Sequence, residues 1–415
     1  MGTDRHVETV VPVPPVSYAT HSWRPKHPDV YSRAEVRRQT GDYESVVTPP
    51  IAGWTLTISG ELIADVEEAS LALREFDLYA LSHLGATNPV LGPMSAILLR
   101  TESASSSQIE QLTSSARQLA LAEIEEGGKQ NADTVIGNVR AMEAALRLSE
   151  KLDIDSILAM HKELLGRQVG MEKEAGRFRD ELVWIGNRDN AGPIGASFIA
   201  PQHGLVRGAV DDVVEFMKRA DVPALVQVAV AHAQFETIHP FVDGNGRTGR
   251  ALAQSLLRNK GLATHTTVPI SAGLLTDTEG YFDALSAFRG GDAGPVVRLF
   301  ADASRFAAST GRDLVDSLYT QVEESSRKLG GLRPQAAAWR VLPLLIGQPV
   351  VNAKYLKATL EVNDAVAQRA LDALTERGVL VERTGHARNR IWQHGGILAV
   401  LDEYAETIRR SQVHR

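Results

Sequence analysis

The segment IHPFVDGNGRTGR, residues 238–250, forces the chain to end one helix and begin another within a few residues. The preceding stretch, residues 224–238, has helical spacing. Pro240 cannot continue that helix, because it lacks an N–H donor and its ring clashes with the preceding turn. Gly244 and Gly246 then allow backbone conformations that other residues resist. A second helix is expected to follow, so a short loop joins two helices here.

This loop carries the residue types of a phosphate site. The N–H groups of a glycine loop that leads into a helix point into one concavity, and the helix N-terminus favours anions. Arg247 and Arg250 lie three residues apart near one face of the first turn, where guanidinium groups clamp phosphate oxygens. Asp243 would repel a phosphate unless a cation such as Mg²⁺ lies between them. With His239 at a helix end as general base, this set predicts phosphoryl or nucleotidyl transfer.

A metal site is an alternative interpretation of the first helix. His232, Glu236 and His239 occur at positions i, i+4 and i+7, so two imidazoles and a carboxylate could hold Zn²⁺. That interpretation gives no role to the glycines and arginines, and we expect His232 to be a hydrogen-bonded core residue instead. A glycine-rich interhelical turn with an incidental histidine is the third interpretation, which we disfavour for the full string.

Composition excludes several classes of protein. The 415 residues suit two or three domains, and 43% hydrophobic residues can form a sizeable core. The absence of cysteine excludes disulfides and thiolate metal sites and fits a cytoplasmic enzyme. A net charge of −7 argues against a chain dedicated to nucleic acid. We expect no membrane association, because no secretory signal is visible and no stretch approaches the ~20 apolar residues of a membrane span.

Helical spacing dominates most of the chain, so a mainly α-helical fold is expected. The first fifty residues, rich in proline, are expected to form an extended, partly ordered arm. Residues 180–201 depart from helical spacing, because a β-prone run, a turn-rich GNRDNAGP and a second apolar run predict a β-hairpin. Helices are predicted over residues 59–80, 106–124, 133–150, 155–166, 204–219, 223–238, 246–259, 278–288 and 295–328.

The pattern changes after Pro334, where three predicted helices precede the β-prone pieces VLVER and RNRIW. This order is typical of a winged helix-turn-helix domain. The third helix carries one net negative charge, whereas Arg383, Arg388 and Arg390 gather in the wing. DNA binding and protein contact, including a homodimer, therefore both stay open. The chain is divided into an N-terminal arm (1–50), an N-terminal helical region (51–130), a catalytic core (131–330) and a winged-helix domain (334–415).

The string HPFVDGNGRTGR resembles the signature of the Fic (Fido-domain) family, HPFx[D/E]GNGRxxR, and fills every position of it. GRFRDELVWIGN at residues 176–187 looks like the family's flap hairpin, and YFDAL at residues 281–285 resembles a further family segment. The similarity covers roughly residues 40–310, and a C-terminal winged helix is a known attachment in the family. The resemblance implies a Fic-type helical core with a β-hairpin flap.

The resemblance also implies a protein adenylyltransferase, which transfers AMP from ATP to a Ser, Thr or Tyr hydroxyl of a target protein or of itself. His239 would deprotonate the hydroxyl, and Asp243 would hold Mg²⁺. The residues implied in ATP binding are Phe241 as the apolar anchor of the loop, Gly244, Asn245, Gly246 and Arg247 at the α- and β-phosphates, Arg250 at the γ-phosphate, and Tyr281 near the adenine. The flap residues that would pair with the target backbone are Val183, Trp184, Ile185 and Gly186.

A second family element is an inhibitory helix of the form [S/T]xxxE[G/N]. SSSQIEQ fits it from Ser106 to Glu110 and departs at Gln111, where glycine or asparagine is usual. The resemblance implies that Glu110 pairs with Arg250 and mis-seats ATP, and the alternative is a capped helix with a surface glutamate. Two other functions stay open. One is a winged-helix transcriptional regulator whose Fic core senses nucleotide, and the other is an enzyme that removes AMP from modified targets.

Overall fold

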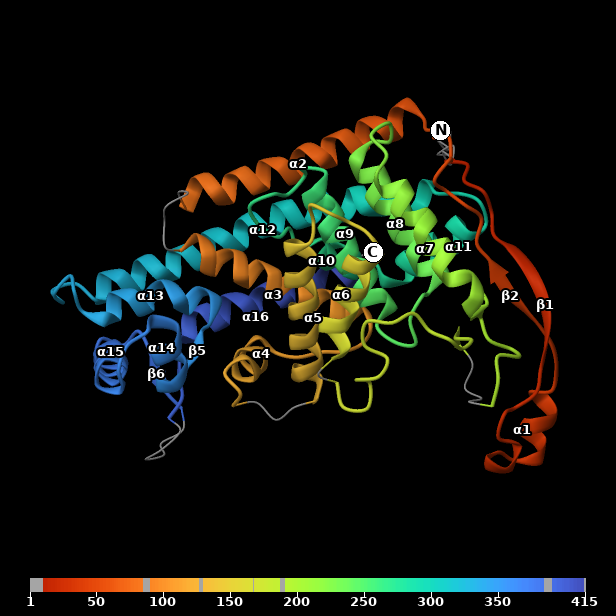
Figure 1. Ribbon diagram of the computed structural model, residues 1–415. Helices are drawn as coiled ribbons and strands as arrows, with labels where there is room; N and C mark the ends of the chain where they lie inside the picture. The colour runs from red at the N-terminus through yellow and green to blue at the C-terminus, as the bar shows by residue number, and fades with distance from the viewer. Residues whose placement is uncertain are drawn as a thin grey trace. The chain divides into compact units, whose positions relative to one another are not determined.

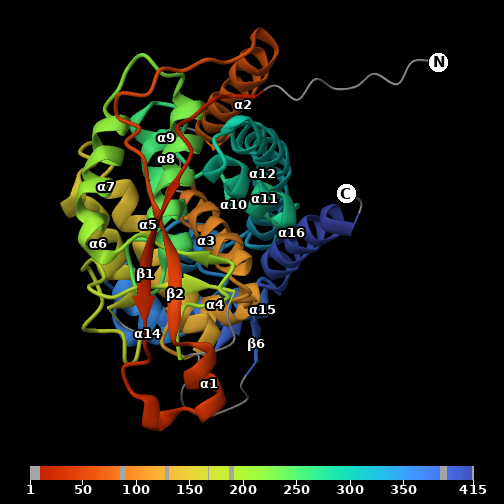
Figure 2. The ribbon, with the colours of Figure 1, turned by 90° about the vertical axis from the view of Figure 1, so that its right-hand side faces the viewer.

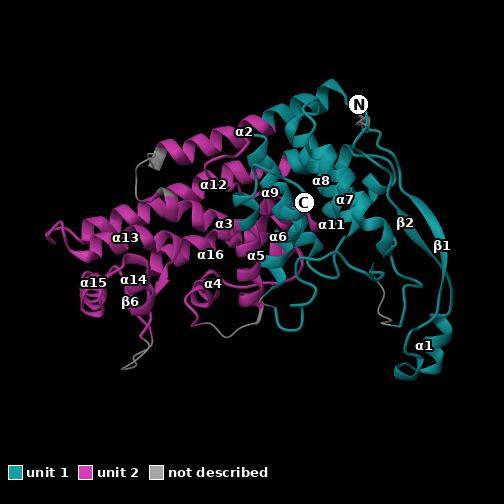
Figure 3. Ribbon diagram, viewed as in Figure 1, with its two compact units in different colours: residues 1–68, 144–260, 279–301 teal, residues 69–143, 261–278, 302–415 magenta. Residues whose placement is uncertain are grey.

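The computed structural model describes residues 10–84, 90–126, 130–166, 168–186, 191–383 and 390–413. The chain is mainly α-helical, which confirms the fold class predicted from hydrophobic spacing (Figure 1). It divides into two compact units, each assembled from three separate stretches of chain (Figure 3). Unit 1 comprises residues 1–68, 144–260 and 279–301, and unit 2 comprises residues 69–143, 261–278 and 302–415. Within the described ranges, no helix is both long enough and apolar enough to cross a membrane.

A fully buried helix forms the centre of unit 1. α8 (Ala224–Ile238) packs against α7 (His203–Met217) and α9 (Asn245–Asn259), and α6 (Ile154–Leu165) packs against α7 and α9. Every α8 residue after the first is buried, so this helix has no solvent-facing side. The residue that follows α8, which is His239, is therefore held on a rigid support.

Residues 10–50 are more ordered than the sequence predicts. β1 (Ser17–Trp23) and β2 (Gly41–Val47) pair antiparallel along their whole lengths, from Ser17↔Val47 to Trp23↔Gly41. η1 (Pro28–Val30) and α1 (Arg33–Arg38) lie between the strands, and Figure 2 shows α1 at the closed end of this N-terminal hairpin. The expectation of a partly ordered arm is wrong for this part. The prolines that suggested it, in VPVPPV and TPP, flank the paired strands rather than interrupt them.

The β-hairpin predicted within residues 180–201 is present, which confirms that part of the prediction. β3 (Trp184–Ile185) pairs antiparallel with β4 (Phe198–Ile199). The strands are shorter than the predicted apolar runs, and the turn residues 187–190 lie outside the described part of the chain. This second hairpin, with its flanking residues 181–201, is called the flap below.

Contacts within unit 1 join the N-terminal hairpin to the flap. The Gln39 side chain exchanges two hydrogen bonds with the main chain of Ile194, at 2.8 and 2.9 Å. The Trp23 indole N–H donates to the carbonyl oxygen of Ala191 at 2.9 Å, and its ring meets Trp184 edge-on, with centroids 5.7 Å apart. The N-terminal hairpin therefore stabilises the flap through contacts between segments distant in sequence, which the β-propensity of the flap residues does not predict.

Unit 2 contains a helix break that the sequence did not predict. The single helix expected over residues 106–124 is instead the end of α3 (Leu91–Ile109) and the whole of α4 (Ala116–Glu123). α4 has its own start signal, because the Ser115 side chain caps the Gln118 N–H in a capping box. α3 packs against α13 (Ala337–Gly347) and against α10 (Ile270–Leu275), a short helix that hydrophobic spacing did not reveal.

The C-terminal part of unit 2 has the three helices and two strands expected after Pro334, together with a third strand. The helices are α13, α14 (Ala353–Leu360) and α15 (Asp364–Glu376), and a three-stranded sheet has the order β5–β7–β6. β5 (Val350–Val351), β6 (Val381–Glu382), β7 (Trp392–Gln393) and α16 (Gly395–Val413) complete this part. Arg388 lies outside the described residues. A winged helix-turn-helix domain and the four sequence-based boundaries stay predictions. The remaining helices are α2 (Gly60–Leu84), α5 (Gln130–Arg147), α11 (Thr278–Arg289) and α12 (Gly294–Lys328).

Candidate active site

His239 lies directly after α8 in a left-handed backbone conformation, with φ 50° and ψ 62°. A residue with a Cβ atom pays roughly 1–2 kcal/mol for this conformation, so the surrounding contacts must hold it there. The ring Nδ1 lies 3.4 Å from the carbonyl oxygen of Glu236. Because a carbonyl oxygen can only accept, this contact places the proton on Nδ1. Nε2 is then left as the atom that can take a proton.

Two reciprocal hydrogen bonds fix the loop between α8 and α9. The Phe241 N–H donates to Asn245 Oδ1 at 2.8 Å, and Asn245 Nδ2 donates to the Phe241 carbonyl oxygen at 2.9 Å. The Phe241 ring is fully buried and stacks on the imidazole of His161, with centroids 3.6 Å apart. The asparagine side chain therefore closes the loop as a main-chain turn would, and the phenylalanine anchors it in the core.

Gly244 is the N-cap of α9, at a position that strongly favours glycine. Its φ of +77° lies in the left-handed region, and an added Cβ atom would lie 2.7 Å from Leu164 Cδ2. The first hydrogen bond of the helix runs from the Thr248 N–H to the Gly244 carbonyl oxygen, at 3.0 Å. The N–H groups of Asn245, Gly246 and Arg247 precede that bond, so the helix ladder leaves them available at the positive end of the helix.

Arg247 supplies buried donors beside these N–H groups. Its side chain is only 4% exposed, and Nη2 lies 3.3 Å from Asp243 Oδ2. Its Nε and Nη1 are buried and have no hydrogen-bond partner among the described residues. Leaving a buried donor unsatisfied costs ~1–3 kcal/mol, so this guanidinium group is arranged for an acceptor that the protein itself does not supply. Arg250, one turn further along α9, is also buried.

His161 of α6 contacts this loop, and no sequence pattern predicts this role for it. Its Nδ1 accepts the Gly176 N–H at 3.1 Å, so Nε2 carries the proton and donates to the Asp243 carbonyl oxygen at 3.0 Å. Burial lowers the pKa of His161 to about 4, which keeps the ring neutral at physiological pH. The Asp243 main chain is thereby fixed while its carboxylate stays 44% exposed at the mouth of the loop.

The flap lies beside His239. The Phe198 ring of β4 meets the His239 ring edge-on, with centroids 6.3 Å apart. The Arg289 guanidinium lies over the Phe198 ring, 4.1 Å from its centroid. The β3–β4 sheet has two strands, so the outer edge of β3 carries backbone groups that the sheet does not use. Of the predicted flap residues, Ile185 is 47% exposed on this strand.

Two other predicted residues lie in the core of unit 1. The Tyr281 hydroxyl and His232 Nε2 are 2.9 Å apart, and both side chains are buried. Burial lowers the pKa of His232 to about 3, which agrees with the core role expected for it. No group of three His, Cys, Asp or Glu in the described ranges could hold a metal ion, so the Zn²⁺ interpretation receives no support. The adenine-contacting role of Tyr281 stays a prediction.

Ser106 and Glu110 belong to unit 2, where they end α3 in a defined way. Ser106 is buried, and the Glu110 residue that caps the helix is exposed. The Leu112 N–H donates to the Ser107 carbonyl oxygen at 3.0 Å, and the Gln111 N–H donates to the Gln108 carbonyl oxygen at 2.8 Å. This pair of bonds is a Schellman ending, which requires a left-handed residue at the position after the cap.

Gln111 occupies that left-handed position, with φ 61°. The structure therefore gives a physical reason for the glycine or asparagine of the inhibitory-helix motif, since these residues adopt the conformation at lower cost. Gln111 forms the same helix ending at the expense of local strain. The departure from the motif at this position thus leaves the placement of Glu110 at the end of α3 intact.

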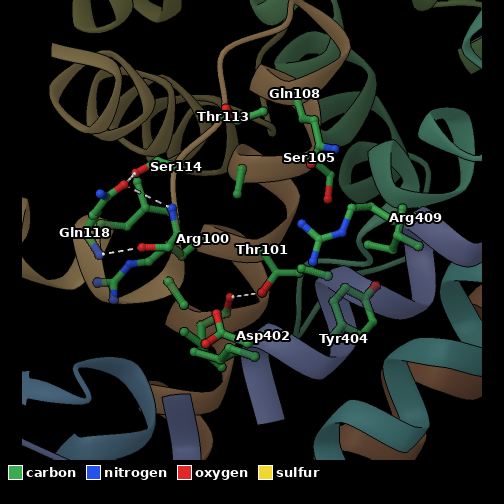
Figure 4. Close-up of a pocket in the computed structure, with 18 of the residues that line it drawn as sticks. Arg100, Thr101, Ser105, Gln108, Thr113, Ser114, Gln118, Asp402, Tyr404 and Arg409 are labelled. Carbon is green, nitrogen blue, oxygen red and sulfur yellow. Dashed lines mark hydrogen bonds between the residues drawn. The ribbon is translucent and has the colours of Figure 1, made fainter. Parts of the chain in front are cut away.

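The turn of α3 that leads to Glu110 also lines a cavity of about 450 Å³ within unit 2. Figure 4 shows Thr101, Ser105 and Gln108 on one wall and Tyr404 and Arg409 of α16 on another. Ser105 and Gln108 lie on either side of Ser106 in the sequence. The helix that carries the candidate inhibitory residues therefore has an open space along one side rather than continuous packing.

Residues 151–257 match the family model described as Fic/DOC family. The chain contains a Fic/DOC domain. The matched segment runs from the residues before α6 into α9, so it includes the flap, His239 and the phosphate-type loop. His161 also lies inside the Fic domain, whereas the N-terminal hairpin and the helix ending at Glu110 lie outside the matched range.

Relatives of known name are similar over this Fic domain. Protein adenylyltransferase fic-1 of Caenorhabditis elegans is 29% identical over 178 residues, which is 40% of this chain and 32% of the relative. Protein adenylyltransferase Fic of Nematostella vectensis is 28% identical over 156 residues, or 38% of this chain and 33% of the relative. The chain thus spans about a third of the length of the curated relatives it matches.

A solved structure of a Fic family protein from Desulfovibrio desulfuricans is similar over a larger share of the chain. It covers 84% of this chain and 99% of its own length, with a TM-score of 0.52 and 22% sequence identity. At this identity the likeness concerns the fold. The mainly helical architecture around the Fic domain is therefore shared with a known structure.

We expect the pH dependence of stability to report the buried His161. Its folded pKa of about 4 lies below the ordinary value of 6.5, so the unfolded chain binds the proton more readily. The contribution of His161 to stability is therefore complete above pH 6.5 and is lost as pH falls toward 4. In His161→Gln, the free energy of unfolding should fall less steeply across this window than in the wild type, as measured by urea denaturation. His203→Gln, at an exposed α7 position, is the control, and equal slopes for His161→Gln and wild type would contradict the assignment.

Proposed function

We propose that this chain is a protein adenylyltransferase that transfers AMP from ATP to a Ser, Thr or Tyr hydroxyl of a target protein or of itself. The observation that carries the proposal is the set of unsatisfied buried donors of Arg247 in the same loop as His239, whose Nδ1 contact with the Glu236 carbonyl oxygen makes Nε2 the basic ring nitrogen. A base beside an anion site suits transfer of a phosphate-linked group to a hydroxyl. The relatives named protein adenylyltransferase support AMP as that group. A pure nucleotide sensor would need no base.

In this proposal, His239 Nε2 takes the proton of the target hydroxyl as the hydroxyl oxygen attacks the α-phosphorus of ATP. The bond between that phosphorus and the pyrophosphate oxygen breaks, and pyrophosphate leaves with the bonding electrons. The N–H groups of Asn245 and Gly246, with Arg247, would hold the α- and β-phosphates, and Arg250 would hold the γ-phosphate. The Nδ1–H contact with the Glu236 carbonyl oxygen keeps the ring in the tautomer that this step requires.

Asp243 fits the role of a Mg²⁺ ligand in this site. Its carboxylate is partly exposed at the mouth of the loop and lies against Arg247, beside the anion site. Mg²⁺ is typically held by one or two carboxylates together with substrate phosphates and waters, so one protein ligand is enough. When bound, the ion would neutralise part of the triphosphate charge. Asp243 can take this role without disturbing the loop, because His161 holds its main chain.

The edge of β3 is suited to hold the target. Val183, Trp184, Ile185 and Gly186 would pair with an extended segment of the target through main-chain hydrogen bonds. Main-chain pairing orders the segment next to His239 but reads little of its sequence. Selection of a target would therefore depend on contacts that lie outside the paired segment.

We also propose that Glu110 restrains this activity by pairing with Arg250. Glu110 is the cap residue of a Schellman ending, and Arg250 is a cation with only 2% of its surface exposed, which favours a charge-assisted bond. An arginine engaged in this way could not hold the γ-phosphate, so ATP would seat unproductively. The same carboxylate could orient a water that removes AMP from a modified target.

The first prediction of this function concerns the base. His239→Ala should lose AMP transfer while ATP binding persists, because the phosphate contacts belong to other residues of the loop. Loss of a general base lowers rates by ~10²–10⁴-fold. Radiolabelled AMP incorporation measures the first quantity and calorimetric titration with ATP the second. Wild-type incorporation by the variant would remove His239 from the reaction.

The second prediction concerns the metal. AMP transfer should stop in a chelator and return on addition of Mg²⁺, and Asp243→Ala should lose most activity at any Mg²⁺ concentration. Asp211→Ala, which removes an exposed carboxylate of α7, is the matched control and should behave as wild type. Activity of Asp243→Ala equal to that of the control would show that the carboxylate has another role.

The third prediction concerns Glu110. Glu110→Gly should raise self-modification several-fold at equal ATP, because Arg250 becomes available to the γ-phosphate. Gln111→Gly is the matched control, since it relaxes the left-handed residue next to Glu110 and keeps the carboxylate. It should therefore stay at the wild-type level. Arg250→Ala should lower activity with or without Glu110. Equal incorporation by wild type and Glu110→Gly would leave Glu110 as an ordinary surface residue.

A further inference from the structure

Arg179 is buried in the loop between α6 and β3 and donates only to main-chain oxygens in the hydrogen bonds that the structure gives it. Its side chain is 3% exposed. The acceptors are the carbonyl oxygens of His239 (2.8 Å from Nε), Glu181 (2.8 Å from Nη1), Pro201 (2.6 Å from Nη2) and Ile238 (3.4 Å from Nη2). One guanidinium group thus joins three separate stretches of unit 1.

Two of these acceptors are at the end of α8. The last carbonyl groups of a helix have no partner in the helix ladder and carry partial negative charge, which favours a cation there. Arg179 donates to the carbonyl oxygens of Ile238 and His239, and its own main-chain N–H donates to the Pro240 carbonyl oxygen at 3.0 Å. These bonds hold the left-handed turn at His239, and with it the direction of the imidazole.

The other two acceptors lie at the base of the flap. Glu181 precedes β3 and Pro201 follows β4, so the guanidinium group ties the two ends of the flap to each other and to the end of α8. The planar fork of arginine can point donors at several acceptors at once, whereas a lysine ammonium is a compact point charge on a flexible stem. The geometry therefore needs arginine rather than any cation.

The positive charge of Arg179 also favours a role beyond the stability of the fold. Burial lowers the pKa of Arg179 to about 10, so the group stays protonated at neutral pH although all four of these acceptors are neutral carbonyls. Burying a cation among neutral acceptors is expensive compared with packing an apolar side chain. Neutral donors could connect the same main-chain groups with a smaller desolvation penalty. The position of this cation next to His239 therefore suggests that Arg179 serves the reaction as well as the fold.

We propose that Arg179 is a positioning residue for AMP transfer, which sets the orientation of His239 and the position of the flap together. The imidazole of His239 and the target hydroxyl held by the flap would then have a fixed relative orientation. This inference rests on the proposed function. A misplacement of about 1 Å can cost ~10²-fold in rate. ATP binding does not depend on Arg179, because Asn245 and His161 hold the phosphate loop through separate contacts.

The test compares Arg179→Gln and Arg179→Lys with Arg177→Gln. Arg177 lies two residues away, is 45% exposed and pairs with Glu174 and Asp180 at the surface, so its replacement is a matched control. We expect the self-modification rate of Arg179→Gln at saturating ATP to fall by ~10²-fold, with unchanged ATP affinity. Hydrogen–deuterium exchange should be faster at residues 182–186. Arg177→Gln should resemble wild type in all three measurements.

The outcomes separate the two proposals. Absence of AMP transfer by the wild-type chain would overturn the proposed function, whereas wild-type rates in Arg179→Gln would overturn only the role of Arg179. If Arg179→Gln loses ATP binding or melts, Arg179→Lys decides, because it keeps the charge but not the fork. It should bind ATP normally and transfer AMP roughly tenfold or more slowly, and a wild-type rate would reject the inference.

Discussion

The break between α8 and α9 is the constraint on which the candidate site depends. α8 is buried on all sides, so its position is fixed by the core, and Pro240 prevents the helix from continuing. The chain then turns through two left-handed residues, His239 and Gly244, before α9 begins. Both a histidine at a helix C-terminus and the free N–H groups of a helix N-terminus are thereby placed within a few residues. One short loop can combine the two ends only because the helices on either side cannot shift.

Contacts from outside the loop maintain this geometry through the main chain. His161 holds the carbonyl oxygen of Asp243, Arg179 holds that of His239, and Glu236 offers its own carbonyl oxygen to the imidazole. The main chain of the loop is thus held by these contacts, so the side chains of His239, Asp243 and Arg247 are not needed to hold it. This division explains why Arg247 can carry unsatisfied buried donors. The unfavourable free energy of these unsatisfied donors is tolerated because other residues stabilise the loop.

The sequence predicted those parts of the structure that depend on local pattern. Hydrophobic spacing located α6 to α9 and the flap, and the loop string located the site. The sequence-based prediction failed where a contact between distant segments determines the local structure. Nothing near Arg179 or His161 in the sequence indicates that their partners lie some sixty and eighty residues away. The end of α3 was not predicted because glutamine rarely adopts a left-handed conformation. The N-terminal hairpin was not predicted because the prolines of VPVPPV and TPP suggested an irregular arm, although they lie outside the strands.

The hydrogen bond between His239 Nδ1 and the Glu236 carbonyl oxygen limits where a captured proton can go. The Glu236 carbonyl oxygen accepts a hydrogen bond from Nδ1–H but is too weak a base to take up the proton itself. This contact therefore cannot transfer a proton from the ring to the protein. In the proposed reaction, a proton taken by Nε2 would have to leave from Nε2, on the side where the reactants would bind. In the proposed reaction, the imidazole would therefore be reset by solvent or by a departing product, and regeneration of the base would be coupled to product release.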